Sequence, residues 1–220
     1  MELFQDIPAL LLQTIDLPGD DVILSLYTRD LGRISVFASK LQRSKKRLRE
    51  IDFFRVLSVN LSKRGSSYVL KDVKTLRCFS VFSSDLELME KGFNWIDIIR
   101  RVPEESADIS LFDNIIGSFI AVDARSVEVI ELFLRFKIFQ SPNTVPRFDQ
   151  IKETVYFCPQ NFQFSVSSFP GAYLLKNNER QFFEFLRRYE IRDVIDSLDR
   201  LPRTSCKRLM EVVEAMERWH

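Results

Sequence analysis

Alternation of apolar and polar residues dominates the first 80 residues of the chain, as in Ile34, Val36 and Ala38 set against Ser35 and Phe37. A period of two is typical of half-buried β-strands. Turn-forming residues separate the alternating stretches, which predict strands at Leu10–Ile15, Val22–Thr28, Arg33–Ala38, Phe53–Asn60 and Ser67–Leu76. Five short antiparallel strands in about 80 residues favour a small closed barrel.

Beyond residue 79 the spacing of apolar residues becomes helical. Ser84 with Glu87 forms a candidate capping box for a helix that ends before Pro103, and Ser110 with Asp113 indicates a second helix start. The same periodicity predicts three further helices, at Ser126–Phe139, Glu179–Leu198 and Thr204–Trp219.

Residues 142–175 lack helical periodicity and contain three prolines, so an irregular or β-rich insertion is expected there. The expected fold class is therefore α+β multidomain, with a β-barrel followed by an α-helical domain. We expect the barrel domain over residues 1–80 and the helical domain over 81–220, with the insertion at 142–178 and the boundary near residues 79–84.

Composition points to a globular protein that crosses no membrane. No apolar run approaches the roughly 20 residues that span a bilayer, and the first residues carry Glu2 and Asp6 where a secretory leader would be basic. The three cysteines, Cys78, Cys158 and Cys206, are widely separated, which fits a reducing compartment. We therefore expect a cytoplasmic protein.

Charge is distributed unevenly although the whole chain carries only +1. Residues 1–80 hold 14 basic and 9 acidic side chains, whereas the remainder holds 18 and 22, giving +5 and −4. The densest basic segment follows the third predicted strand and contains no acidic residue between its six cations, Lys40, Arg43, Lys45, Lys46, Arg47 and Arg49. Such a cluster suits a phosphate backbone, because Lys and Arg displace condensed counterions. A solvated connection that binds nothing is the alternative.

The chain lacks the residues that common enzyme sites require. Its one histidine is His220, the last residue, which argues against Ser-His-Asp or Cys-His catalysis. The six glycines are too scattered for a phosphate-binding loop of either common type. Isolated cysteines do not offer the four closely spaced ligands that zinc needs. We expect a binding protein without catalytic residues, metal or cofactor.

Several segments, in order, resemble the RecO family of bacterial recombination mediators. The strand Thr28–Val36 runs into the basic segment Lys40–Arg49, and Phe54–Leu61 and Leu70–Val73 resemble the family's next strands. Further on, Phe133–Lys137 followed by Gln140–Pro142 resembles the helix and proline that precede the family's metal-binding insertion. The resemblance implies an N-terminal OB-fold, a helical domain and, in many members, a zinc module held by two Cys-x-x-Cys pairs.

The zinc module is where the chain departs from the family. Cys158 stands at the first ligand position, but Asn161 occupies the second, and Leu174–Asn178 contains no cysteine. We expect a zinc-less insertion held together by burial of aromatic side chains, namely Phe157, Phe162, Phe164, Phe169 and Tyr173. Zinc bound by Cys158 with unusual partners is the alternative.

The resemblance implies a non-catalytic function in DNA repair. Such a protein binds single- and double-stranded DNA and anneals complementary strands. With RecR it assists recombinase loading onto strands coated by single-stranded DNA-binding protein, in the cytoplasm near the nucleoid. The candidate phosphate contacts are the six cations above together with Lys63 and Arg64, and the candidate stacking residues are Tyr27, Phe37 and Tyr68. Each aromatic has the alternative of being a core residue.

The family also binds the acidic, phenylalanine-ended C-terminal tail of single-stranded DNA-binding protein. An apolar pocket rimmed by cations would suit that tail, and the candidate residues are Arg125, Phe133, Arg135, Phe136 and Lys137. Three other functions stay open: an OB-fold RNA-binding factor, a protein-interaction adaptor whose basic segment meets an acidic partner, and an uncharacterised enzyme.

Overall fold

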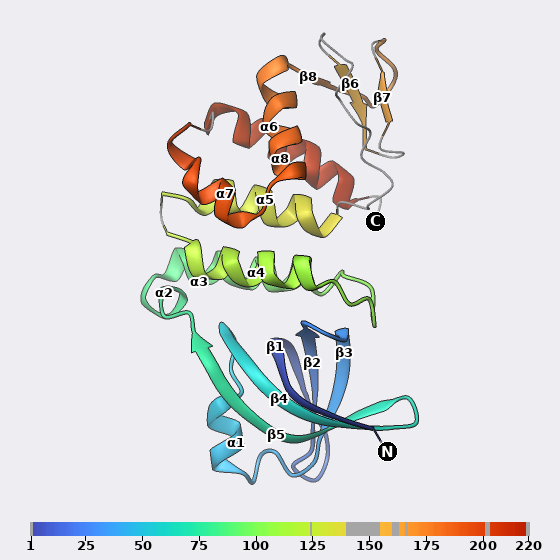
Figure 1. Cartoon of the computed structure of the whole chain (residues 1–220), viewed down its shortest axis with the longest axis vertical. Helices are drawn as coiled ribbons and strands as arrows, with labels where there is room; N and C mark the ends of the chain where they lie inside the picture. The colour runs from blue at the N-terminus through green and yellow to red at the C-terminus, as the bar shows by residue number, and fades with distance from the viewer. Residues whose placement is uncertain are drawn as a thin grey trace. The chain divides into compact units, whose positions relative to one another are not determined.

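The structure is a computed structural model that describes residues 2–123, 125–139, 155–159, 163–165, 167–200 and 203–218. Two compact units divide the chain, Met1–Ile120 and Ala121–His220 (Figure 1).

The first unit contains a closed five-stranded barrel in the order β1-β2-β3-β5-β4. Its strands are β1 (Glu2–Asp16), β2 (Val22–Thr28), β3 (Gly32–Ala38), β4 (Arg55–Arg64) and β5 (Ser67–Cys78). The predicted barrel is confirmed, but one of its pairings is not antiparallel. β3 and β5 run parallel and meet at only two residue pairs, Val36 with Tyr68 and Phe37 with Val69. This short seam closes the barrel.

Alternation along β2 and β3 separates a core face from an outer face. Val22, Leu24 and Leu26 of β2 point into the core, as do Ile34 and Val36 of β3. The residues between them therefore lie on the outside of the barrel.

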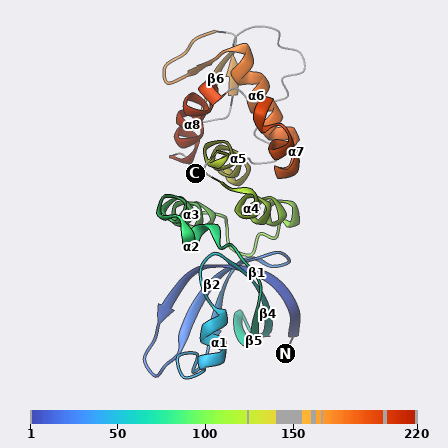
Figure 2. The same cartoon turned by 90° about the vertical axis from the view of Figure 1, so that its left-hand side faces the viewer.

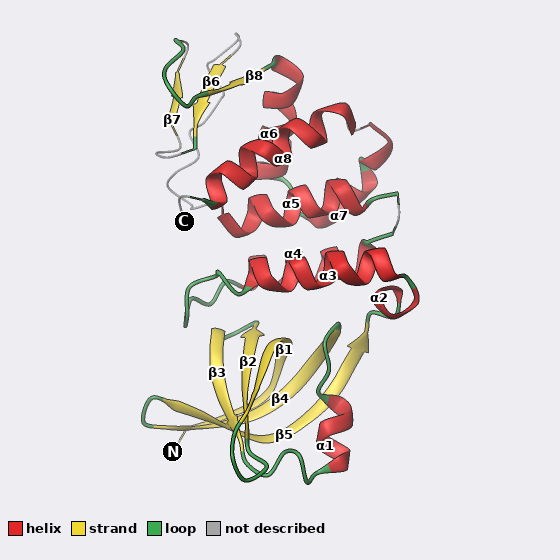
Figure 3. Cartoon of the chain, turned by 180° about the vertical axis from the view of Figure 1, so that it is seen from behind, coloured by secondary structure: helices red, strands yellow, loops and turns green. Residues whose placement is uncertain are grey.

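The basic segment after β3 contains a short helix that the pattern did not predict, α1 (Lys45–Glu50). Ser44 caps it by accepting a hydrogen bond from the Arg47 backbone N–H at 3.5 Å. None of its residues is buried, so packing contributes little to its stability. Two hydrogen bonds hold its end against β5: the Thr75 backbone N–H donates to Glu50 Oε2 at 2.7 Å, and the Thr75 hydroxyl donates to the Glu50 carbonyl oxygen at 3.2 Å. Figure 3 shows α1 beside β5.

Three helices follow the barrel within the first unit, α2 (Val81–Ser84), α3 (Leu86–Ile99) and α4 (Ile109–Ala121). α3 and α4 lie side by side at one end of the barrel (Figures 1 and 2). Strands give way to helices where the sequence predicted, near residue 80, yet the helices up to residue 120 belong to the same compact unit as the barrel.

Both predicted capping residues in this region are wrong by one or two positions. Asp85 caps α3, because its Oδ1 accepts from the backbone N–H groups of Glu87 and Leu88 at 2.9 and 3.1 Å. Ser84 instead ends α2 and donates its hydroxyl to the carbonyl oxygens of Ser80 and Val81. At the start of α4 the Asp108 carboxylate accepts from the Leu111 backbone N–H at 2.9 Å, which leaves Ser110 inside the helix. Aspartate satisfies the orphan amides of a helix start at least as well as serine does.

The second unit combines helices with a small sheet. Its helices are α5 (Val127–Phe139), α6 (Asn177–Arg188), α7 (Ile191–Asp196), the 3-10 helix η1 (Leu198–Arg200) and α8 (Arg203–Glu217). The single helix predicted from Glu179 to Leu198 is wrong. Tyr189 adopts an extended conformation that ends α6, and Glu190 begins α7 with a capping box closed by Asp193.

The predicted insertion contains β-structure among its described residues. β6 (Val155–Cys158) lies between β7 (Gln163–Ser165) and β8 (Tyr173–Leu175) in an antiparallel sheet. Phe157 is buried against Phe183 of α6, with ring centroids 5.8 Å apart, as the prediction of an aromatic core requires. Phe169 and Tyr173 are half-buried, and the side chains of Phe162 and Phe164 lie outside the described residues.

Candidate nucleic-acid interface

An open groove of about 600 Å³ lies on the outer face of the barrel where β3 meets β5. Residues of β2, β3 and β5 form it together with the hairpin that joins β4 to β5. They are Ile23, Ser35, Phe37, Arg64, Ser66, Ser67, Tyr68 and Val69. The β2–β3 face and this hairpin are where OB-fold barrels bind oligonucleotides.

The strand period determines which side chains reach the groove. Val36 and Ala38 are buried, so Phe37 between them faces outward and is half-buried. Gly65 turns the hairpin at a φ of 59°, which brings Arg64 and Ser66 over the seam. The groove therefore offers one aromatic face, three serine hydroxyls and one guanidinium group.

The basic segment begins next to the groove, because Lys40 follows Phe37 by three residues. Lys40 has a φ of 49°, a conformation uncommon for lysine, and its backbone N–H donates to Asp21 Oδ1 at 2.7 Å. This bond fixes the start of the segment while leaving the ammonium group exposed.

Five of the eight candidate cations are exposed and form no ion pair with any residue that the structure describes. They are Lys40, Lys45, Lys46, Arg49 and Arg64. An unpaired exposed cation can meet a phosphate without first breaking an internal contact, which favours these five as phosphate contacts.

The other three candidates make contacts within the first unit. Arg43 forms an ion pair with Asp20, and Arg47 donates to the Ser39 carbonyl oxygen at 3.1 Å. Lys63 Nζ donates to the Tyr68 hydroxyl at 3.1 Å, which raises the pKa of the lysine, and lies 4.8 Å from the centre of the tyrosine ring. Each of the three would have to exchange a partner to bind phosphate.

Two of the three candidate stacking residues are core residues. Tyr27 is completely buried and packs on Phe112 with ring centroids 5.9 Å apart; burial raises the pKa of its hydroxyl. Tyr68 is 5% exposed and packs on Phe4. A base could reach neither ring face without disrupting the barrel, so both expectations are corrected. Phe37 alone keeps an accessible face among the three.

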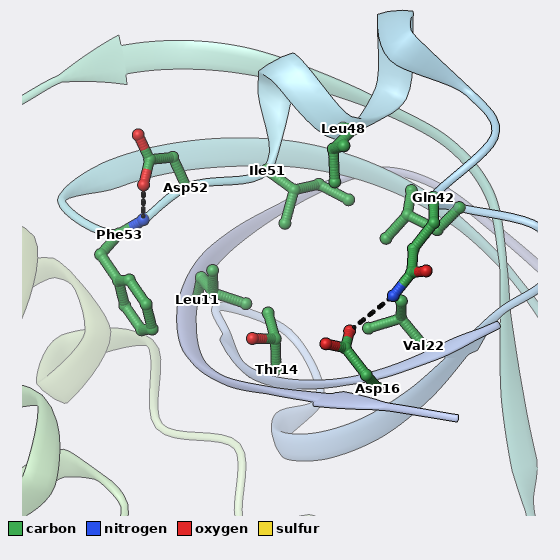
Figure 4. Close-up of a pocket in the computed structure, with 10 residues that line it drawn as sticks. Leu11, Thr14, Asp16, Val22, Gln42, Leu48, Ile51, Asp52 and Phe53 are labelled. Carbon is green, nitrogen blue, oxygen red and sulfur yellow. Dashed lines mark hydrogen bonds between the residues drawn. The ribbon is translucent and has the colours of Figure 1, made fainter. Parts of the chain in front are cut away.

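A second hollow of about 510 Å³ lies between α1 and the strands β1 and β2, and it suits a polyanion poorly (Figure 4). Its walls are mostly apolar, with Leu48 and Ile51 of the α1 segment facing Leu11 and Val22. The charged residues in its lining are both acidic, Asp16 and Asp52. The Gln42 side-chain amide donates to Asp16 Oδ1 at 3.0 Å. Phosphate would be repelled here.

The barrel, the groove and the basic segment coincide with the part of the chain that a known family matches. Residues 1–79 match the family model described as Recombination protein O N terminal. The N-terminal domain belongs to the RecO family. The match covers the whole barrel, and it identifies this part of the chain as the N-terminal domain found in RecO-type recombination and repair proteins. No curated protein matches the chain.

Sequence analysis of this RecO-type barrel missed the polar half of the groove. Ser35 lies far in the sequence from the adjacent Ser66 and Ser67, none of the three carries a charge, and only the parallel seam brings Ser35 close to the other two. It also missed three exposed cations on β5, Lys71, Lys74 and Arg77. Residues three apart do not share a face of a regular strand, so the alternation pattern could not have grouped these three.

The residues expected to hold the tail of single-stranded DNA-binding protein do not form an open pocket. Phe133 and Phe136 are completely buried, which corrects their assignment as accessible residues. Arg135 forms ion pairs with two carboxylates, Glu131 Oε1 at 3.0 Å and Glu217. Burial alone would lower the pKa of its guanidinium group, but the two carboxylates outweigh this effect and raise the pKa. Lys137 donates to the Arg187 carbonyl oxygen at 3.2 Å. Arg125 alone of the five is exposed.

The zinc module of the RecO family has no visible counterpart among the described residues. They include no group of three or more histidine, cysteine, aspartate or glutamate side chains that could hold a metal ion. Cys158 is buried at the end of β6, and Asn161 lies outside the described residues. Nor does any described helix have the length and apolar character needed to cross a membrane.

Proposed function

We propose that the chain binds DNA, single- and double-stranded, through the groove at the β3–β5 seam and the unpaired cations of residues 40–49 and 64. The observation that carries this proposal is the combination, on an OB-type barrel, of an outward-facing aromatic ring and exposed cations that form no ion pair with any residue the structure describes.

Binding of this kind needs no covalent step. A base stacks on the Phe37 ring, which is worth about 1–3 kcal/mol and tolerates any sequence because every base has a flat face. The hydroxyls of Ser35, Ser66 and Ser67 both donate and accept hydrogen bonds, so they can meet the edge of any base. Lys40 and Arg64 meet the phosphates on either side. The proposed site thus prefers an unpaired strand but not a sequence.

The finer role follows the family. The protein anneals complementary strands and, with RecR, assists recombinase loading onto DNA coated by single-stranded DNA-binding protein, in the cytoplasm at the nucleoid. No catalytic residue is assigned. The acidic tail of that coating protein remains a proposed partner, with its site away from the buried Phe133 and Phe136; calorimetry with the tail peptide tests it, and no heat at high micromolar concentration would remove it.

The salt dependence of binding tests the DNA contact. Five phosphate contacts with a single strand give a slope of log K against log salt of about −3.5, or roughly a hundredfold loss of affinity between 50 and 200 mM salt. In the variant Lys40→Glu with Arg64→Glu the slope should fall to about −2.1, or roughly twentyfold over the same range. The measurement is a titration of a labelled oligonucleotide at several salt concentrations.

A matched control separates local contacts from net charge. Arg192 and Lys207 are exposed in the second unit, and their double change to Glu alters the total charge by the same amount. We expect the control to retain the wild-type slope. Equal slopes for wild type and the Lys40/Arg64 variant would remove the proposal, and competition by unlabelled RNA and DNA of one sequence identifies the preferred nucleic acid.

A further inference from the structure

Beyond the groove, the strand β5 carries a second row of cations. Lys71, Lys74 and Arg77 are exposed, and none forms an ion pair with any residue in the described parts of the chain. None of them lines the groove. The last groove residue on β5 is Val69, and Lys74 follows it by five positions along the strand, about 17 Å at 3.3 Å per residue.

Helix α1 adds its own cations to this row. Thr75 of β5 holds Glu50 at the end of α1. Lys74 directly precedes Thr75, and Arg77 follows it by two residues. Lys45, Lys46 and Arg49 are exposed on that helix. We call the resulting set the β5–α1 surface, and it comprises Lys45, Lys46, Arg49, Lys71, Lys74 and Arg77.

The carboxylates of these two elements do not neutralise the surface. They are Asp72 on β5 and Glu50 on α1, so six cations against two carboxylates leave +4. Glu50 is engaged with Thr75, and this bonding lowers the pKa of its carboxyl with help from Arg55 and Lys46, so it stays ionised. A phosphate backbone compensates an excess of this size.

Protection of a sheet edge explains only part of the pattern. Past Val69, β5 pairs with β4 alone, and lysines on such an unpaired edge discourage association between sheets. The cations of α1 lie on a helix, however, where no sheet edge needs protection. Helix α1 packs against the same stretch of β5, so its cations and those of β5 together form a surface that suits a polyanion.

We propose that the β5–α1 surface binds a second DNA strand while the groove at the β3–β5 seam holds the first. This proposal rests on the DNA binding proposed above and specifies it further: one chain holds two strands at once. When only one strand is bound, the α1 cations contact it together with Lys40 and Arg64. When two are bound, Lys40 and Arg64 keep the strand in the groove, and the α1 cations join the β5 cations in contacting the second. Holding two strands on one barrel raises their effective concentration for each other, which is what annealing requires.

Two variants of the full-length chain test the assignment. The first, K71E/K74E/R77E, reverses the β5 cations, and the second, F37A/R64E, alters the groove. Two non-complementary single strands of about 10 nucleotides, each within the range that one OB-fold covers, carry a donor and an acceptor fluorophore. Affinity for one strand and energy transfer between two are measured, and native mass spectrometry counts strands per chain.

We expect the wild type to form a complex of one chain with two strands. K71E/K74E/R77E should keep its affinity for the first strand within about twofold. Its affinity for the second strand should fall at least tenfold, since three contacts to a single strand contribute about −2.1 to the slope of log K against log salt. F37A/R64E should instead lower the affinity for the first strand.

The outcomes separate this proposal from the one it rests on. A wild type that binds no strand removes the DNA-binding function itself. A wild type that binds one strand but never two overturns the second surface alone. An equal loss of affinity for the first strand in K71E/K74E/R77E and F37A/R64E also overturns the second surface. One strand following a continuous path over the groove and β5 would then account for the contacts of all these cations. Far-UV circular dichroism and thermal unfolding confirm that each variant is folded.

Discussion

At the scale of single residues, arginines near the barrel end differ in function according to partners that lie far away in the sequence. Arg29 forms an ion pair with Asp113 at 3.0 Å, and Arg33 donates to the Val102 carbonyl oxygen at 2.8 Å. Arg29 lies in the turn between β2 and β3 and Arg33 in β3, so both connect this end of the barrel to α4 or to the segment that precedes it. Arg64, by contrast, has no ion pair among the described residues and faces the groove. Charge alone could not distinguish structural arginines from binding ones.

Gly32 is the residue where the turn between β2 and β3 touches this helical segment. Its φ is 69°, and a Cβ atom built there would lie 2.5 Å from the backbone oxygen of Ser106. Gly32→Ala should therefore destabilise the protein by more than the roughly 1–2 kcal/mol that a left-handed conformation costs alanine, because backbone atoms cannot rotate away. Unfolding in urea measures the loss.

Gly19→Ala is the matched control for that substitution. Gly19 has a φ of 83°, but a Cβ atom there would meet nothing within 4 Å. The control should show the conformational cost alone, about 1–2 kcal/mol. Equal losses for the two substitutions would contradict a close approach between Gly32 and Ser106.

At the scale of elements, the sequence predicts those with a clear period and misses those fixed by local contacts. β2 has the bounds that alternation predicted, and α5 begins within one residue of its prediction. The short helix α1 was missed because it buries no residue, so no apolar period indicates it. The break between α6 and α7 was missed because the apolar period continues across Tyr189, while the capping box at Glu190 decides the end.

The candidate site was predictable to a similar extent. Cation positions follow from the sequence, and five of the eight proved free of ion pairs within the described chain. Which aromatic residue stays accessible does not follow from the sequence. Tyr27 is covered by Phe112 of α4, and Tyr68 packs on Phe4, contacts that no local pattern indicates. The parallel seam that forms the groove joins residues more than thirty positions apart, which local patterns cannot reveal.

The docking of α1 on β5 depends on the ionised form of Glu50. Because the Thr75 hydrogen bonds lower the pKa of Glu50, its stabilising contribution is complete above the carboxyl's ordinary pKa and is lost as the pH falls through the lowered value. The Thr75 amide proton should therefore shift with pH at a midpoint below about 4.3, the usual value for glutamate. Nuclear magnetic resonance of the Thr75 amide follows this titration.

Glu50→Gln provides the control, since an amide accepts the same hydrogen bond but does not titrate in this range. The variant should show no such transition at Thr75. A transition that persists in Glu50→Gln would assign the shift to another group and leave the ionised Glu50 without a role in holding α1.

At the scale of the whole molecule, the barrel shares its unit with the helices that follow it. An aromatic cluster packs between them: Phe54 stacks on Phe82 with ring centroids 4.7 Å apart, and Phe119 of α4 lies 5.3 Å from Phe82 and 5.5 Å from Trp95. Phe54 precedes β4, so this cluster joins the barrel to α2, α3 and α4. The RecO-type domain match ends at residue 79, before three of these four aromatic residues.

Two fragments distinguish the folding unit from the family match. Residues 1–121 retain the aromatic cluster, both arginine contacts and the groove, so this fragment should unfold cooperatively and bind a single strand with the affinity and salt slope of the full chain. Residues 1–80 leave Phe54 and Phe79 without Phe82 and Phe119, and burial of such side chains contributes about 1.5–3 kcal/mol each. The shorter fragment should therefore lack a cooperative transition. Thermal unfolding and oligonucleotide titration compare them, and equal stability of the two would show that the barrel folds without its helices.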